Sequence, residues 1–172
     1  MDATELQGLQ APVKDRYRSD PSAALVTLSA RGELGSENAS CSVDVGRQLV
    51  EAGLHPATGG DGTMACSGDM LLQALVACAG VTLRSVAINR GLTVAGTVTA
   101  DGVLDFRGTL GVDREAPVGF SDIRLTFDVV SDASEEQLAQ LLKLTERYCV
   151  VLQTLRSAPP VAATLEVTSA SA

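Results

Sequence analysis

The sequence predicts an α+β fold made of one domain. Segments rich in β-branched residues fall into groups separated by two helical regions, rather than alternating with single helices. The chain has 172 residues with 45% hydrophobic side chains, which is enough for a single domain with its own core. Only 3% of the residues are aromatic, so leucine, valine and alanine must build that core. We expect one domain over residues 1–172, with 1–20 as an N-terminal arm.

The first half of the chain predicts a pair of strands followed by a loop. Residues 23–30 (AALVTLSA) and 40–45 (SCSVDV) have the composition and alternation of strands. The connection between them is expected to be a loop that contains Arg31. Residues 53–68 are rich in glycine and small polar residues, which predicts a loop leading into a helix. This loop matches neither common phosphate-binding motif.

A long apolar helix is predicted between Ser67 and Gly91. Ser67 can cap its start, Asp69 places a negative charge in the first turn, and Gly91 supplies the stop. Its apolar residues cover more than one stripe, which predicts burial on most sides. An intertwined dimer would provide that cover more easily than one chain. The most apolar run, residues 70–83, is shorter than the roughly 20 residues of a bilayer span, so we expect a core helix and no membrane partner.

Three more strands are predicted over residues 92–112 and 122–130. The period-two alternation of polar and apolar residues supports them. The Asp101–Gly102 pair is typical of a tight turn between two of these strands.

A helical region and a last strand complete the chain. Ser134 and Gln137 form a capping-box pattern, which predicts a helix running to about Arg147. Cys149 then lies at a helix junction. A final strand is predicted at residues 161–167, after two prolines.

Charge and composition exclude several function classes. The net charge of -8 and the pI of about 4.5 argue against nucleic-acid binding. The acidic N-terminus does not resemble an export signal, so a cytoplasmic location is expected. The four cysteines contain no CxxC pair, and His55 is the single histidine. These residues indicate neither a disulfide framework nor a metal site, and no cofactor motif is present.

Two of the cysteines lie in distinctive contexts, and here the sequence resembles the OsmC/Ohr family of thiol peroxidases. The stretch SGDMLLQALVACAGVTL around Cys78 resembles the first family signature, an acidic residue followed by a small, apolar run ending in cysteine. The stretch RYCVVLQTL around Cys149 resembles the second, Cys-Pro-Val followed shortly by Thr-Leu, with Val150 in place of the proline. The order of elements also fits, so the resemblance covers nearly the whole chain.

The resemblance implies an intertwined homodimer whose antiparallel sheets pack around a central buried helix that bears Cys78. It implies active sites at the subunit interface and reduction of organic hydroperoxides to alcohols. Cys78 would become a sulfenic acid and then form a disulfide with Cys149. A dithiol would restore the pair, and a lipoyl-type dithiol is one candidate.

The resemblance also suggests how the reactive thiol is activated. A thiol with a pKa of about 8.5 is mostly protonated at neutral pH, so a nearby cation is expected. In the Ohr subgroup an arginine and a glutamate do this work. Arg31 occupies the comparable loop, with Arg18 and Arg147 as alternatives. Asp69 is the closest acidic match, because Gly68 stands at the glutamate position.

Two other interpretations stay open at this point. The chain could be a non-catalytic dimeric binding protein with a small apolar ligand in its interface pocket. It could also be a structural relative in which the cysteines only fill the core. Cys41 and Cys66 are interpreted as non-catalytic in every case.

Overall fold

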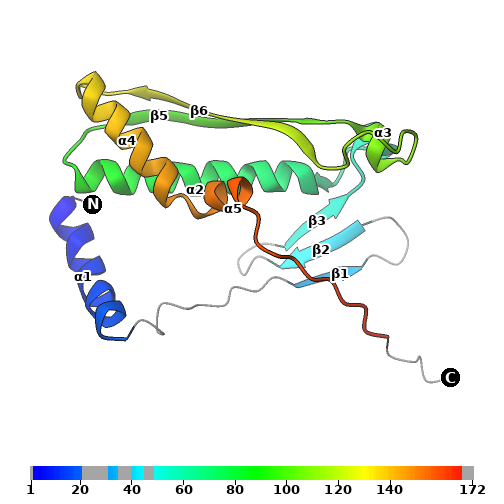
Figure 1. Cartoon of the computed structure of the whole chain (residues 1–172), viewed down its shortest axis with the longest axis horizontal. Helices are drawn as coiled ribbons and strands as arrows, with labels where there is room; N and C mark the ends of the chain where they lie inside the picture. Colours follow the sequence, from blue (N-terminus) through cyan, green and yellow to red (C-terminus); the bar gives the residue numbers. More distant parts are fainter. Residues whose placement is uncertain (1, 21–30, 35–39, 45–48, 168–172) are drawn as a thin grey trace.

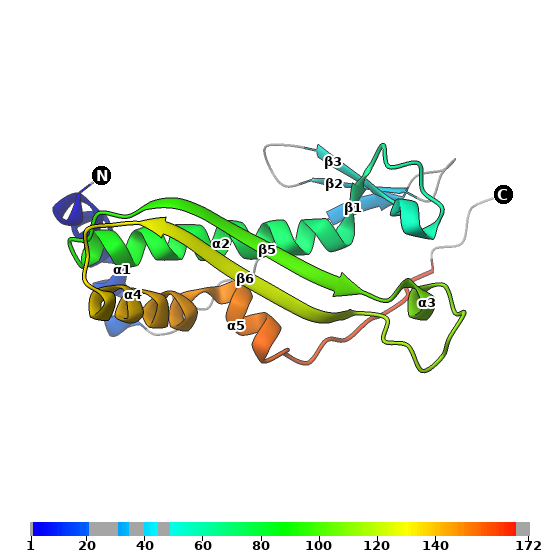
Figure 2. The ribbon, with the colours of Figure 1, turned by 90° about the horizontal axis from the view of Figure 1, so that it is seen from above.

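Helix α2 (Ser67–Asn89) is the longest element of the computed structural model, which describes residues 2–20, 31–34, 40–44 and 49–167. The antiparallel pair β5 (Ala95–Leu104) and β6 (Phe120–Val130) runs alongside α2 in both views (Figures 1 and 2). Helices α4 (Glu135–Tyr148) and α5 (Val150–Arg156) pack against α2 as well. The mixed architecture confirms the predicted α+β class.

Most of the N-terminal arm is a helix, α1 (Ala3–Ser19). Asp2 and Glu5 form a reciprocal capping box, with each carboxylate accepting a backbone N–H of the other residue at 2.8 and 3.0 Å. The helix lies beside the C-terminal half of α2 (Figure 1). The arm therefore packs against the rest of the domain through α2.

A second sheet has the order β1-β2-β3-β4. Its strands are β1 (Arg31–Leu34), β2 (Ser40–Asp44), β3 (Leu49–Gly53) and β4 (Ala65–Cys66). Strand β2 confirms the strand predicted at 40–45, whereas the one predicted at 23–30 lies outside the described residues. The expected loop position of Arg31 is wrong, because this residue opens β1 opposite Asp44. A short polar strand of this kind forms because it pairs with a neighbouring strand. A single sequence does not reveal that pairing.

The ends of α2 follow the sequence closely. Cys66 is the N-cap residue, one position earlier than predicted, and Ser67 is the first helical residue. Asp69 lies in the first turn as expected. Gly91 follows the C-cap with a φ of 65°, a left-handed conformation that glycine adopts without steric cost.

One chain buries only a single stripe of α2. The fully or nearly fully buried residues are four apart, namely Leu75, Ala79, Leu83 and Ala87. The last two pack with Leu141 of α4 in the main core cluster. Val81, on another face, is 72% exposed. The expected burial on most sides is therefore not reached within one protomer.

Length and composition alone would allow α2 to cross a membrane. Its most apolar 18-residue window has a mean hydropathy of 1.8, and 22% of that window is buried in the structure. The helix extends beyond the apolar run at residues 70–83, whose length alone suggested that it is too short to cross a bilayer. Its packing against β5, α4 and α5 is that of a core helix.

The predicted turn at Asp101–Gly102 is wrong, because both residues lie inside β5. Gly102 pairs opposite Ile123, and the hairpin contains two long strands where three were expected. A Cβ at Gly102 would lie 2.4 Å from the Phe120 ring. Because glycine has no side chain, the aromatic ring can lie close to the strand at this position.

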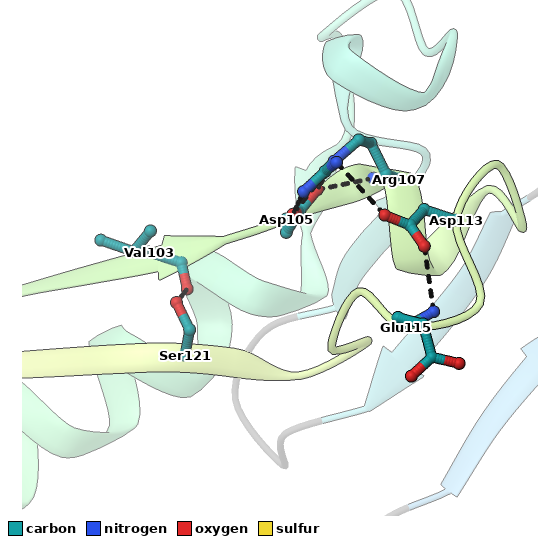
Figure 3. A network of polar contacts seen from close by, with 6 residues as sticks. All are labelled: Val103, Asp105, Arg107, Asp113, Glu115 and Ser121. Carbon is teal, nitrogen blue, oxygen red and sulfur yellow. Dashed lines mark hydrogen bonds and ion pairs between the residues drawn. The ribbon is translucent and has the colours of Figure 1, made fainter.

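A polar network closes the far end of this hairpin (Figure 3). The Arg107 guanidinium lies 2.6 Å from Asp105 and 3.2 Å from Asp113, and Asp113 accepts the Glu115 N–H at 3.0 Å. The side-chain hydrogen bond from Arg107 lowers the pKa of Asp105. These contacts order the connection that includes the short helix α3 (Phe106–Thr109).

The C-terminal region confirms one helix and corrects one strand. Ser134 and Gln137 form the predicted capping box of α4, and Cys149 lies at the junction with α5. Residues 161–167, predicted as a strand, form no regular element. A strand needs a hydrogen-bonded neighbour, and no described strand pairs with this segment.

Truncation of Leu141 should destabilise the fold far more than truncation of its neighbour. Leu141 is 2% exposed and Leu142 is 43% exposed. We expect Leu141→Ala to lower the free energy of unfolding by about 2–5 kcal/mol, and Leu142→Ala by about 1 kcal/mol or less. Urea denaturation of both variants measures this, and equal losses would contradict the described core.

Candidate active site

Cys78 and Cys149 come together where α2 faces the start of α5. Cys78 lies in the middle of α2 and is half-buried. Both thiols are free, and the Cys149 thiol donates a hydrogen bond to the Cys78 sulfur. The fold thus joins the two cysteines that the sequence singled out.

Cys149 is held at a break between two helices. It is the C-cap of α4 and the N-cap of α5, with extended backbone angles of φ -73° and ψ 105°. Its N–H donates to the Thr145 carbonyl, and its carbonyl accepts the Gln153 N–H, each at 3.0 Å. Its exposure is 0%. The backbone therefore holds the thiol in place on both sides.

The surroundings of Cys78 favour its thiolate. Burial raises the pKa of the Cys78 thiol, but hydrogen bonds from the Val151 N–H, the Cys149 thiol and the Val150 N–H together outweigh it. The Thr82 hydroxyl adds a smaller contribution, so the pKa of Cys78 lies below its ordinary value. Unsatisfied N–H groups at a helix start stabilise a negative charge in this way.

The opposite holds for Cys149. Burial raises the pKa of the Cys149 thiol, and the adjacent Cys78 raises it further, against a hydrogen bond from the Leu152 N–H. Of the two thiols, Cys78 therefore loses its proton first and Cys149 keeps its proton to higher pH. One thiol is prepared to attack and its neighbour to donate a proton.

Val150 contributes through its backbone. The family signature that the sequence resembles has proline after the second cysteine, and proline has no N–H. With valine at this position the first residue of α5 can donate to the Cys78 sulfur. The departure from the signature thus adds a donor to the site.

Two of the arginines proposed from the sequence, Arg18 and Arg147, contact other side chains. Within the described part of the chain, no charged side chain contributes to the lowered pKa of Cys78. Arg18 is ion-paired with Asp15 on α1, and Arg147 lies 5.7 Å from the centre of the Tyr148 ring. The side chain of Arg31 lies outside the described residues. A catalytic role for Arg31 stays a prediction.

Asp69 is exposed in the first turn of α2. It lies nine positions before Cys78 on the same helix, a rise of about 14 Å. The structure does not bring this carboxylate to the thiol pair and places it where it offsets the helix dipole. Its catalytic role also stays a prediction.

The remaining cysteines and the histidine lie elsewhere. Cys41 is paired opposite Ala52 in the first sheet, and Cys66 is half-buried before α2. His55 accepts the Ala57 N–H at 3.0 Å and stacks on Phe106 with ring centres 5.0 Å apart. Among the described residues, no three histidine, cysteine, aspartate or glutamate side chains gather into a metal-binding group.

One large cavity lies apart from the thiol site. About 950 Å³ lies between β6 and the helices α2, α4 and α5, with Leu75, Phe127 and Leu155 among its lining. Neither cysteine of the pair lines it. We place the candidate site at the cysteines, because the two thiols have oppositely shifted pKa values. The size of a cavity does not indicate reactivity.

Sequence reasoning missed the donors around Cys78. The N–H groups of Val150 and Val151 are main-chain atoms, and only the predicted helix junction at Cys149 pointed toward them. Thr82 had a clearer signal, because it follows Cys78 by four residues and so shares its helix face. Its hydroxyl donates to the Cys78 carbonyl at 2.8 Å.

Comparisons with known proteins agree with this fold. The family of OsmC-like proteins matches residues 60–164. An OsmC-like protein from Mycoplasma pneumoniae has 17% identity and a TM-score of 0.64, covering 77% of this chain and 89% of its own. An organic hydroperoxide resistance protein from Elizabethkingia anophelis has 18% identity and a TM-score of 0.58, covering 78% and 91%. The comparison with curated proteins finds no significant match.

The two thiols should titrate on opposite sides of an ordinary cysteine. A Cys41→Ser/Cys66→Ser protein is pulsed with iodoacetamide across a pH series, and mass spectrometry measures alkylation at each remaining thiol. Because the pKa of Cys78 is lowered and that of Cys149 is raised, the alkylation midpoint of Cys78 should fall below that of an unperturbed cysteine and the midpoint of Cys149 above it. Faster reaction at Cys149, or the reverse order of midpoints, would contradict the described site.

Proposed function

Because this chain belongs to the OsmC-like protein family, we propose that it is a thiol-dependent peroxidase that reduces organic hydroperoxides to alcohols. The observation that carries the proposal is the contact between two thiols with oppositely shifted pKa values. Structural neighbours named organic hydroperoxide resistance proteins, from Elizabethkingia anophelis and Bacillus subtilis, support the same class of reaction.

The first step is attack by the Cys78 thiolate on the terminal oxygen of the hydroperoxide. The S–O bond forms as the O–O bond breaks, and the electron pair leaves with the alkoxide, which takes a proton to become the alcohol. Cys78 is oxidised to a sulfenic acid. The N–H groups at the start of α5 stabilise the thiolate form of this sulfur relative to the thiol.

The second step joins the two cysteines. The Cys149 sulfur attacks the sulfur of the Cys78 sulfenic acid, an S–S bond forms, and the hydroxyl leaves as water with the proton of Cys149. A dithiol then reduces the disulfide by thiol exchange and is itself oxidised. This cycle requires a reducing compartment, and we propose the cytoplasm.

The surroundings of the thiols suit an organic substrate. Val81, Tyr148 and Val150 are near neighbours of the two cysteines along the chain and are 72%, 59% and 70% exposed. Val81 and Tyr148 line one cavity beside α2, where apolar side chains can bury an alkyl or aryl group. They favour an alkyl or aryl hydroperoxide over hydrogen peroxide, which offers no apolar area to bury.

We further propose that the active form is a homodimer. One chain leaves much of α2 uncovered, and its C-terminal segment exposes Val161, Leu165 and Val167 by 82–89%. These residues alternate in the sequence, as on one face of a strand. A second copy supplies a sheet edge for this segment and covers the exposed apolar surface.

Removing the apolar face of the C-terminal segment should weaken the dimer. Sedimentation of the full chain should give the mass of two copies, and Val161→Ser/Leu165→Ser/Val167→Ser should shift the mass toward one copy at the same concentration. The matched control is Val112→Ser in the hairpin loop, where the side chain is 74% exposed. A monomeric full chain would contradict the dimer without touching the thiol chemistry.

The peroxidase itself is tested with cumene hydroperoxide and a dithiol. The full chain should consume the hydroperoxide, using dithiothreitol or dihydrolipoamide, and should consume hydrogen peroxide more slowly. Cys78→Ser should abolish turnover because the nucleophile is lost. Cys149→Ser should stop the dithiol cycle while a sulfenic acid still forms at Cys78, detectable by dimedone.

The variant Cys66→Ser is the matched control, since it removes a half-buried thiol outside the pair. It should retain full turnover. Absence of hydroperoxide consumption by the full chain with either dithiol would refute the peroxidase and favour a non-catalytic binding protein.

A further inference from the structure

The two cysteines in contact are also a pair of soft metal ligands. Both are free thiols, and a hydrogen bond between them brings their sulfur atoms together. Cys149 is fully buried and Cys78 is half-buried, so a solute reaches the pair at Cys78. Thiolate sulfur selects soft metal ions such as Cu(I) over hard ones. The same contact that permits a disulfide therefore also permits a metal ion to join the two sulfurs.

No third ligand accompanies the pair in the described part of the chain. Histidine, cysteine, aspartate and glutamate side chains form no group of three there. Cys66 and Met70 precede Cys78 by twelve and eight residues along α2, rises of about 18 and 12 Å. Cys41 belongs to the first sheet, and the Met64 sulfur lies beside β3. The candidate metal site thus consists of two sulfurs.

The number of ligands decides which ion such a site holds. Structural Zn(II) is bound by four protein ligands and iron–sulfur clusters by four cysteines, so a site of two sulfurs suits neither. A soft monovalent cation with a filled d shell is satisfied by two thiolates on opposite sides of the ion. The pair therefore selects by coordination number as well as by softness.

The charge of a metal-bound pair is balanced by groups already at the site. One monovalent cation and two thiolates leave a net charge of -1. The Val150 and Val151 N–H groups donate hydrogen bonds to the Cys78 sulfur and lower the pKa of its thiol. The same donors stabilise the negative charge of the metal-bound sulfur. Metal binding therefore adds no uncompensated charge to a partly buried site.

We propose that Cys78 and Cys149 form a two-coordinate binding site for a soft monovalent cation of the Cu(I) class. Each sulfur forms one bond to the ion, the thiol protons leave to the solvent, and no electron is transferred. The bound ion occupies the sulfur that would attack a hydroperoxide, so metal binding and disulfide formation exclude each other. This site requires the thiol pair and does not depend on peroxide reduction.

Competition with a coloured chelator measures the site directly. The reduced Cys41→Ser/Cys66→Ser protein is titrated with Cu(I) under nitrogen in the presence of bathocuproine disulfonate, and it should retain one Cu(I) per chain. Cys78→Ser, made in that protein, should retain none, because a single thiolate loses the ion to the chelator. X-ray absorption should show two sulfur neighbours around copper, and bound Cu(I) should protect both thiols from iodoacetamide.

A second variant guards against loss of the fold. Cys149→Ala, in the same parent protein, should also retain no Cu(I), and circular dichroism of both variants checks that they remain folded. Retention of Cu(I) by either folded variant, or three or more protein ligands around copper, would overturn the two-sulfur site. Retention of one Zn(II) per chain by the parent protein would contradict the selection by coordination number.

The outcomes for the metal site and for the peroxidase are separable. Retention of one Cu(I) by the pair without any consumption of cumene hydroperoxide would keep the metal site and refute the peroxidase. Consumption of hydroperoxide by a protein that gives up all its Cu(I) to the chelator would refute the metal site and keep the peroxidase.

Discussion

The hydrogen bonds from the first turn of α5 to the Cys78 sulfur are the contacts on which the candidate site depends. They exist because α4 ends at Tyr148 and α5 begins at Val150, after the single residue Cys149, with its first N–H groups pointing at α2. A continuous helix through Cys149 would consume those donors internally. The break therefore both places the second thiol and polarises the first.

The hydrogen-bond donors around the Cys78 sulfur include backbone N–H groups and a thiol, whereas the resemblance to the family led us to expect a cation. A cation acts on a thiol over several ångströms and is screened by salt, whereas main-chain N–H groups act only in contact and carry no net charge. A site built from N–H groups can be dry and apolar around the sulfur. The apolar neighbours of the two thiols are compatible with that arrangement.

Local signals predicted much of the fold. The capping box at Ser134, the stop at Gly91 and the junction at Cys149 are decided by residues within a few positions of each other, so one sequence is enough to see them. The α+β class follows in the same way from the grouping of strand and helix patterns. The cysteine pair was predicted from the two motifs around Cys78 and Cys149. No local pattern reveals that these two residues are in contact in space.

The failures have a common cause in long-range pairing. Gly102 resembles a turn residue until the Phe120 ring is placed over it, and Arg31 becomes part of a strand only through its pairing opposite Asp44. Residues 161–167 have a strand pattern but no described neighbour to bond. The donors at Val150 and Val151 are backbone atoms, which no side-chain pattern reveals.

The complete burial of Cys149 decides how a disulfide between the two cysteines could be opened. An external dithiol meets the half-exposed Cys78 sulfur first, so Cys149 becomes the leaving group in the exchange. A thiol with a raised pKa leaves slowly. In the proposed cycle, a dithiol reductant completes the exchange with its own second thiol, whereas a single-thiol compound leaves a mixed disulfide on Cys78.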